Sequence, residues 1–282
     1  MITTADFYGT RVSRLVLGDN PFIGNSYVHE MYGGNEMLDY YTSDTVVRAL
    51  FEAQDCGINT YMALADQFIL RSIRQFRREG GKMNLIFQTY PAADLEANIV
   101  HMMAYDPIAI YHQGSTLDLM VEENNFDLLF KRLEMIKKTG VKTGLGTHEP
   151  ETLLKAEREK WGMDFYATCL YNSRRENRGG QSSFLTGKPK HQVFYPGDPP
   201  LMYEAIRAVE KPCIAFKLFA GGQVFAGKPQ DETPRVVEKV FGETFDGIKP
   251  CDLTCVGVFQ KYKNQIRENA EIAGKVLAAA VR

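Results

Sequence analysis

The stretch GINTYMALADQF, residues 57–68, carries the pattern that decides the fold. A glycine suited to a helix end comes first, a short apolar run follows, and the run stops at an acid, Asp66. Short apolar runs between turn residues are typical of strands that are buried on both faces. Segments with helical spacing precede and follow this run, so the stretch is predicted to be one strand of a parallel sheet with helical connections.

The same strand-and-helix unit recurs eight times along the chain. The predicted strands are residues 13–18, 59–63, 84–90, 108–113, 142–148, 164–172, 213–220 and 253–259. Helical spacing is clearest over residues 42–57, 125–140 and 264–280. Eight units in 282 residues favour a single α/β domain over residues 1–282, closed as a (β/α)8 TIM barrel. A doubly wound sheet is the alternative, although no Gly-x-Gly-x-x-Gly follows the first strand.

Composition excludes several classes of protein. The formal charge of −2 gives no electrostatic footprint for nucleic acid or an acidic membrane. No run of 18 apolar residues is present, and the first residues lack the apolar core of a signal peptide. The five cysteines are scattered and form no Cys-x-x-Cys pair. We therefore expect a cytoplasmic protein with reduced, buried thiols that acts on a small-molecule substrate.

Two connections are too long for simple turns, at about residues 19–41 and 173–198. Each follows a predicted strand, so in a barrel both would lie over the C-terminal face, where active sites form. Loops of this length are usually functional or disordered. Their glycines and aromatic residues suit lids, and decoration of the barrel is the alternative.

Polar residues follow the predicted strands and would line the barrel mouth. The residues with acid, base or electrostatic chemistry are Asp19, Asp66, Tyr90, His112, His148 and Lys217. The residues suited to binding a substrate are Asn20, Gln113, Glu149, Tyr171 and Asn172. Polar groups at the ends of apolar strands are costly to bury unless they are paired or used.

His112 and His148 end neighbouring strands, which lie about 4.8 Å apart in a sheet. With Asp66 they form a two-histidine, one-carboxylate set that suits several divalent metals, and Glu149 is an alternative carboxylate. The two histidines are otherwise acid and base groups, or make structural hydrogen bonds. A motif such as His-Glu-x-x-His, which would support a metal, is absent from the sequence.

Basic residues occur at two further positions of interest. Lys217 interrupts a predicted strand, where a lysine serves as a base, forms a Schiff base or pairs with a carboxylate. Lys261, Lys263 and Arg267 cluster before the last predicted helix. Helix N-termini favour anions, so this cluster is a candidate phosphate site for a cofactor, unless it is simply a solvated face.

Several segments together resemble the aldo/keto reductase superfamily of NADP-linked barrels. They include GTRVSRLVLGDNPF near the start, ALFEAQDCGINTY, AIYHQG, TGVKTGLGTHEPETLLKA, FYATCLYN, CIAFKLFAGG and NQIRENAEIAG. The resemblance spans most of the chain and implies a TIM barrel that binds NADP(H). It also implies that His112 is the active-site histidine.

The same alignment lacks most of that family's catalytic residues. The family uses an Asp–Tyr–Lys–His tetrad, and here Met62 and Gln67 stand at its Asp and Tyr positions. Tyr90 ends the strand where the family's lysine is expected, and His148 replaces part of the pair that holds the nicotinamide. Tyr90 and Lys217 are the residues available to rebuild a proton donor.

Three functions follow from this pattern. The first is an enzyme that isomerises, epimerises or eliminates on a sugar-like or other polar carbonyl compound, by acid–base chemistry with or without a divalent metal. The second is a divergent NADP-dependent oxidoreductase that binds its cofactor through Lys261, Lys263 and Arg267. The third is a non-catalytic binding or regulatory protein of the same fold.

Overall fold

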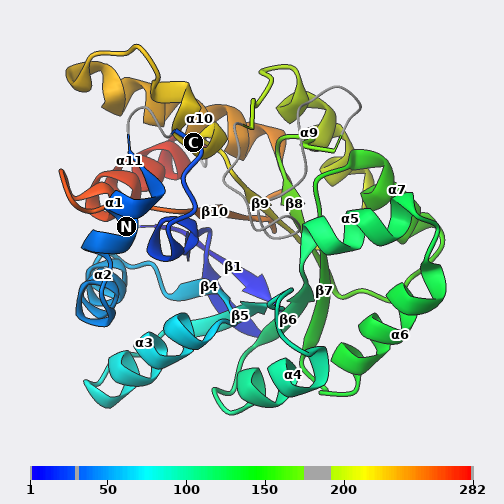
Figure 1. The fold of residues 1–282 in the computed structure, drawn as a ribbon. Helices are drawn as coiled ribbons and strands as arrows, with labels where there is room; N and C mark the ends of the chain where they lie inside the picture. Colours follow the sequence, from blue (N-terminus) through cyan, green and yellow to red (C-terminus); the bar gives the residue numbers. More distant parts are fainter. Residues whose placement is uncertain (1, 29–31, 175–191, 281–282) are drawn as a thin grey trace.

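Eight parallel strands close into a barrel in the order β10-β3-β4-β5-β6-β7-β8-β9 (Figure 1). The structure is a computed structural model that describes residues 2–28, 32–174 and 192–280. The barrel strands are β3 (Leu15–Gly18), β4 (Thr60–Leu64), β5 (Asn84–Gln88), β6 (Ala109–His112), β7 (Lys142–Thr147), β8 (Phe165–Cys169), β9 (Cys213–Phe216) and β10 (Leu253–Val256). All eight lie at the predicted places, so the (β/α)8 TIM barrel is confirmed.

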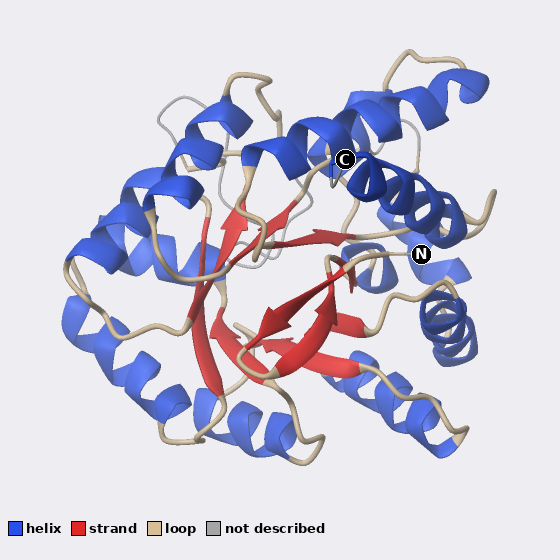
Figure 2. Ribbon diagram, turned by 180° about the vertical axis from the view of Figure 1, so that it is seen from behind, coloured by secondary structure: helices blue, strands red, loops and turns tan. Residues whose placement is uncertain are grey.

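Helices surround the barrel on its outside (Figure 2). They are α1 (Gly34–Tyr40), α2 (Ser43–Asp55), α3 (Gln67–Arg78), α4 (Leu95–Met103), α5 (Gly114–Glu122), α6 (Phe126–Lys137), α7 (Pro150–Arg158), α9 (Asp198–Ala208), α10 (Thr233–Gly247) and α11 (Gln265–Ala280). Short 3-10 turns add η1 (Asn20–Ile23), η2 (Ala220–Phe225) and η3 (Gln230–Glu232). Side-chain caps begin several helices: Thr42 accepts a hydrogen bond from the backbone of α2, and Asp94 from that of α4.

Successive side chains along each strand point to opposite faces of the sheet, so the apolar residues form two layers, one inside the barrel and one between the strands and the helices. Residues that point into the barrel form one buried cluster, which includes Val16, Met62, Ile86, Ala109, Tyr111, Phe165, Ala167, Ile214, Leu253 and Cys255. Alternate residues, such as Ile110 on β6 and Tyr166 on β8, join the larger cluster between strands and helices. This alternation decides which polar side chains reach the mouth.

A hairpin that the sequence analysis did not predict closes the N-terminal end of the barrel. Its strands β1 (Thr4–Phe7) and β2 (Thr10–Ser13) pair antiparallel, and Phe7 joins the interior cluster. Its turn places Tyr8 and Gly9 at φ +53° and +87°, as two-residue hairpin turns require. With that end filled, the C-terminal face is the open end of the barrel.

The two long connections differ from simple loops. Residues 19–41 contain η1 and α1, although the sequence was interpreted there as a loop. Most of residues 173–198 lies outside the described residues. The described parts of both connections meet through Gln223, whose Nε2 donates to the Tyr27 carbonyl at 3.1 Å and whose Oε1 accepts from the backbone N–H of Phe194 at 3.2 Å.

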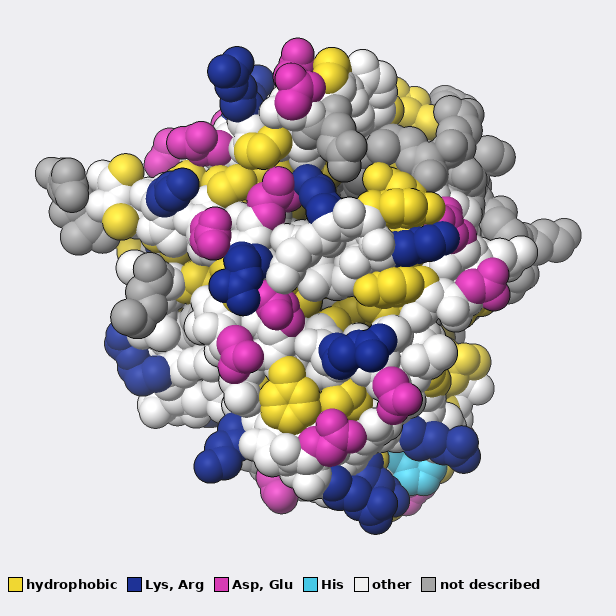
Figure 3. All heavy atoms as spheres, turned by 90° about the vertical axis from the view of Figure 1, so that its left-hand side faces the viewer, with side chains coloured by type: hydrophobic (Ala, Val, Ile, Leu, Met, Phe, Trp, Pro, Cys, Tyr) yellow, Lys and Arg dark blue, Asp and Glu magenta, His cyan; other side chains and the backbone are white. Residues whose placement is uncertain are grey.

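All five cysteines are free thiols, as expected. Cys169, Cys213 and Cys255 are buried, but Cys56 is half-buried and Cys251 is exposed, so burial of every thiol was wrong. Within the described residues, no helix combines the length and apolarity needed to cross a membrane. Basic and acidic side chains alternate across the face shown in Figure 3.

Candidate active site

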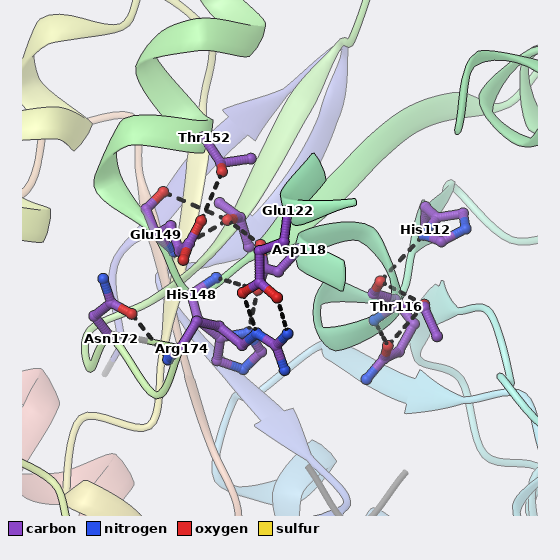
Figure 4. A network of polar contacts seen from close by, with 11 residues as sticks. His112, Thr116, Asp118, Glu122, His148, Glu149, Thr152, Asn172 and Arg174 are labelled. Atoms are coloured by element: carbon purple, nitrogen blue, oxygen red, sulfur yellow. Dashed lines mark hydrogen bonds and ion pairs between the residues drawn. The ribbon is translucent and has the colours of Figure 1, made fainter. Parts of the chain in front are cut away.

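The centre of the candidate site is a buried, hydrogen-bonded pair of side chains, His148 and Asp118 (Figure 4). His148 directly follows β7, and Asp118 lies on α5, which follows the neighbouring strand β6. Oδ2 of Asp118 accepts from Nδ1 of His148 at 2.8 Å and from its backbone N–H at 3.0 Å. Oδ1 of Asp118 accepts from the Thr147 hydroxyl at 2.6 Å. Both carboxylate oxygens therefore have donors.

This arrangement fixes the state of the His148 ring. Because Nδ1 donates to Asp118, Nε2 is the nitrogen left with a lone pair in the neutral ring. Among the described residues, Nε2 makes no hydrogen bond. Burial lowers the pKa of His148, Asp118 opposes this, and Lys217 and Arg174 lower it further. The ring is consequently an oriented, neutral base.

Close backbone approach brings α5 against the His148 ring. A Cβ atom on Gly114, the first residue of α5, would lie 3.2 Å from Cε1 of His148 and 3.1 Å from the backbone carbon of Gly146. On another side, the Phe216 ring meets the imidazole edge to face, with centroids 5.9 Å apart. The small residue and the aromatic ring together hold the imidazole plane.

Lys217, the lysine among the predicted catalytic residues, interacts electrostatically with both His148 and Asp118. Its Nζ lies 4.6 Å from the centroid of the Tyr27 ring and 5.3 Å from that of Phe194. Burial works against its charge, but Tyr27, Cys169 and Asp118 outweigh burial and raise the pKa of Lys217. Lys217 is therefore an ammonium ion at neutral pH, which does not suit a Schiff-base nucleophile.

Arg174 and Glu149 complete the polar surroundings of the His148–Asp118 pair. Nε of Arg174 donates to Oε1 of Glu122 at 2.7 Å, and its backbone N–H donates to Oδ1 of Asn172 at 2.9 Å. Burial, with Asp118 as a further cause, raises the pKa of Glu149 to about 7. Glu149 can therefore change its protonation state near neutral pH.

His112 does not belong to this cluster, and Figure 4 shows it apart. It lies on the same face of β6 as Ile110, which points toward the helices. Nε2 of His112 accepts from Nε of Arg132 at 2.8 Å, and Nδ1 lies 3.1 Å from the Gln113 carbonyl. Burial and Arg132 lower the pKa of His112 to about 3. The expectation that His112 faces His148 was wrong, because the strand pleat turns it outward.

The predicted metal set is not assembled either. Asp66 caps α3, where its Oδ1 accepts from the Ile69 N–H at 2.7 Å. Of the other two predicted ligands, His112 faces the helix layer, where it accepts from Arg132, and His148 faces Asp118. Throughout residues 2–28, 32–174 and 192–280, no three His, Cys, Asp or Glu side chains come together in a way that holds a metal ion.

Asp19 lies across the barrel from His148, because β3 and β7 are four strands apart in the closed order. Its Oδ2 accepts from the Leu64 N–H. Burial raises the pKa of Asp19 to about 7, and the nearby Asp66 adds to this. Asp19 is thus a second group at the C-terminal end of the barrel that titrates near neutral pH.

Other predicted residues have structural partners. The Gln113 side chain caps α5 by accepting from the Thr116 N–H at 2.8 Å, and Asn20 begins η1. Tyr171 packs on Phe194, with centroids 5.1 Å apart. Tyr90 follows β5 and Lys217 follows β9, two strands that are again four places apart in the closed order, so these two residues do not form the expected proton-donor pair.

The candidate phosphate site consists of cations that are already paired. The ion pairs are Lys261–Glu36 at 2.6 Å, Lys263–Glu268 at 2.6 Å and Arg267–Glu52 at 2.7 Å. Asn264 caps α11 by accepting from the Arg267 N–H at 2.9 Å. Exposed pairs of this kind are weak, but an incoming phosphate would have to displace three carboxylates.

Sequence reasoning missed Asp118, Arg174 and Glu122. Asp118 had a detectable signal, because this acid stands between two leucines in the STLDLM segment. Arg174 and Glu122 had none, since a surface glutamate and a loop arginine are common. Their pairing depends on where the chain folds after β8.

Comparisons with known proteins agree on the fold. No family model matches the sequence, and no curated protein is detectably similar to it. An aldo/keto reductase from Brucella melitensis matches with a TM-score of 0.55 and 11% identity, over 99% of this chain and 98% of its own. Dihydropteroate synthase from Yersinia pestis matches with a TM-score of 0.55 and 12% identity over 100% of both chains.

A third match is a truncated 3-deoxy-D-arabino-heptulosonate 7-phosphate synthase from Thermotoga maritima, with a TM-score of 0.53 and 11% identity over 99% of this chain and 91% of its own. At such identities the matches show the shared barrel alone. A reductase and two synthases match about equally well, so the barrel is that of an enzyme fold with no class assigned.

Proposed function

We propose that the chain is an acid–base enzyme that moves a proton on a small polar substrate with a carbonyl group, with His148 as the proton-transferring residue. The observation that supports this most is the Nε2 atom of His148, which has no hydrogen-bond partner among the described residues while Asp118 holds Nδ1 at 2.8 Å. An imidazole oriented by a buried carboxylate is a common arrangement for general base catalysis.

The proposed step begins with His148 neutral. Its Nε2 takes a proton from the carbon next to the substrate carbonyl, and the electron pair of that C–H bond moves to give an enolate. Asp118 stabilises the imidazolium that forms, as a buried carboxylate does in other dyads. In an α-hydroxy carbonyl substrate, return of the proton to the former carbonyl carbon, with the neighbouring hydroxyl losing its proton and the enolate oxygen gaining one, isomerises the substrate. Return of the proton to the opposite face of the same carbon epimerises it, and departure of a β-substituent with its bonding electron pair completes an elimination.

Two alternatives remain proposals of lower standing. Reduction with NADP(H) requires a cofactor site, and Lys261, Lys263 and Arg267 already have carboxylate partners. A non-catalytic protein would not need the Asp118–His148 arrangement, although such a pair also stabilises the fold. The similarity to a reductase structure does not decide between these functions, because a synthase structure matches this chain with the same TM-score of 0.55.

Deuterium incorporation tests the proposal without knowledge of the product. Purified protein is incubated in D2O with separate aldoses, ketoses, aldonates and uronates, and loss of each substrate C–H signal is followed by NMR. Exchange next to a carbonyl supports the proposal. Micromolar binding of NADPH by calorimetry, with no exchange in any compound, would favour the oxidoreductase instead.

A further inference from the structure

We propose that the substrate is an anion and that Lys217 binds its carboxylate or phosphate group. This inference deepens the proposed function and rests on His148 being the reacting base. It concerns the side of the mouth formed by Lys217 at the end of β9 and by the rings of Tyr27 and Phe194. We call these three residues the lysine–aromatic cluster.

The lysine–aromatic cluster is built from three separate segments. Gln223 joins two of them, because it bonds the Tyr27 carbonyl and the Phe194 N–H. The rings of Tyr27 and Phe194 lie 5.4 Å apart. Gly221, at φ +59°, leaves room for Tyr27, since a Cβ there would lie 2.6 Å from the Cβ of Tyr27. The rings are therefore held in place.

Lys217 itself adopts an unfavourable backbone conformation, with φ +62°. A non-glycine residue in the left-handed region is strained, and such residues concentrate at functional sites. Lys217 also differs from Lys142 and Lys249, which pair with Asp164 and Asp252. In the part of the chain that the structure describes, Lys217 has no ion pair.

The ring faces, a hydrogen bond to Tyr27 and the charge of Asp118 keep the Lys217 ammonium charged, but no carboxylate of the described residues forms an ion pair with it. An anionic group of the substrate would supply that direct counter-charge. The same rings can contact the C–H face of a polyhydroxy chain, as aromatic side chains provide large apolar contact areas. Binding the anion at Lys217 would hold the attached carbon chain within the mouth that also contains His148.

Direct binding measurements test whether the protein prefers an anionic ligand. Calorimetry compares gluconate with neutral glucitol, and glucose 6-phosphate with glucose, on the wild-type protein. We expect at least one anion to bind about tenfold or more tightly than its neutral partner, which corresponds to about 1.4 kcal/mol. The two pairs distinguish a carboxylate from a phosphate.

Variants then locate the preference. Lys217→Met should abolish it, whereas Lys217→Arg should retain part of it, and Lys275→Met on the exposed face of α11 should leave it unchanged. If Lys217→Met fails to fold, the salt dependence of wild-type binding replaces it: the preference should shrink as ionic strength rises.

Equal affinities within both pairs, no anion binding in the millimolar range, or a preference that survives Lys217→Met would each overturn the inference. The result is separable from the proposed function. His148→Asn should lose proton exchange but keep the anion preference, so exchange can fail while anion binding stands, and anion binding can fail while exchange stands.

Discussion

Nδ1 of His148 lies 2.8 Å from Oδ2 of Asp118, and the same oxygen accepts the His148 backbone N–H at 3.0 Å. One carboxylate oxygen thus positions both the ring and the chain that carries it. This relationship joins the middle of α5, the helix that follows β6, to the residue after β7, and β6 and β7 are neighbouring parallel strands. It makes Asp118 the positioning residue of the site.

Replacing Asp118 with asparagine should reduce proton exchange by about two to four orders of magnitude. The amide can donate to Nδ1, which favours the ring form with its proton on Nε2, and a comparable change in a serine protease dyad costs about 10⁴. The measurement is the exchange rate together with ¹⁵N NMR of the His148 ring. Asp127→Asn, on the exposed side of α6, is the matched control; equal rates for both variants would contradict the role given to Asp118.

Substitution of Gly114 by alanine should weaken both fold and activity. The new Cβ would lie 3.1 Å from the Gly146 backbone and 3.2 Å from the His148 ring, so we expect a loss of about 1–3 kcal/mol in the free energy of unfolding, as overpacking produces. Urea denaturation measures this. Gly242→Ala in α10, where nothing lies within 4 Å, should be neutral or stabilising by up to about 1 kcal/mol.

The pH dependence of the free energy of unfolding should reflect the protonation of the Asp19 carboxyl group. Because burial raises its pKa from the ordinary value to about 7, the folded state binds the proton more tightly than the unfolded state. The stabilisation is fully present below about pH 4 and is lost as pH rises through about 7, by an order of a few kcal/mol.

Asp19→Asn removes this titration, so the difference in unfolding free energy between wild type and variant should change between pH 4 and 7. Asp39→Asn, at an exposed position of α1, should show no such change. A wild-type curve parallel to that of Asp19→Asn over this range would contradict the raised pKa.

His112 should prove structural rather than catalytic. Its pKa is lowered to about 3, so its neutral form stabilises the fold above pH 6.5, and this contribution is lost as pH falls from about 6.5 toward 3. His112→Ala leaves the Arg132 guanidinium without its acceptor and should cost about 1–3 kcal/mol. Exchange per folded molecule should stay within a few-fold of wild type; a loss as large as that of His148→Asn would restore the family-type role.

The barrel could be predicted because each strand carries a local signal. Apolar runs such as NLIFQTY stop at polar residues, and helical spacing follows them. The hairpin before β3 was missed because its strands, TADF and TRVS, contain no continuous apolar run. The helix α1 lay in a segment rich in glycine and tyrosine, which is typical of a loop.

The candidate site was predictable only in part, for a geometric reason. His148 and Lys217 directly follow β7 and β9, at the C-terminal ends of those strands. His112 occupies an equivalent place in the sequence, but it is the last residue of β6 and the pleat directs it outward. Asp118 lies on helix α5. Looking for polar residues at the ends of predicted strands could not identify it.

The most direct measurement compares deuterium exchange catalysed by wild-type protein with that of His148→Asn and His101→Asn. Asparagine at 148 can still donate to Asp118 but has no base at the Nε2 position, and His101 is exposed on α4. If His148 transfers the proton, exchange falls to background in His148→Asn and stays unchanged in His101→Asn. Exchange that persists in the folded His148→Asn variant would contradict the proposed function.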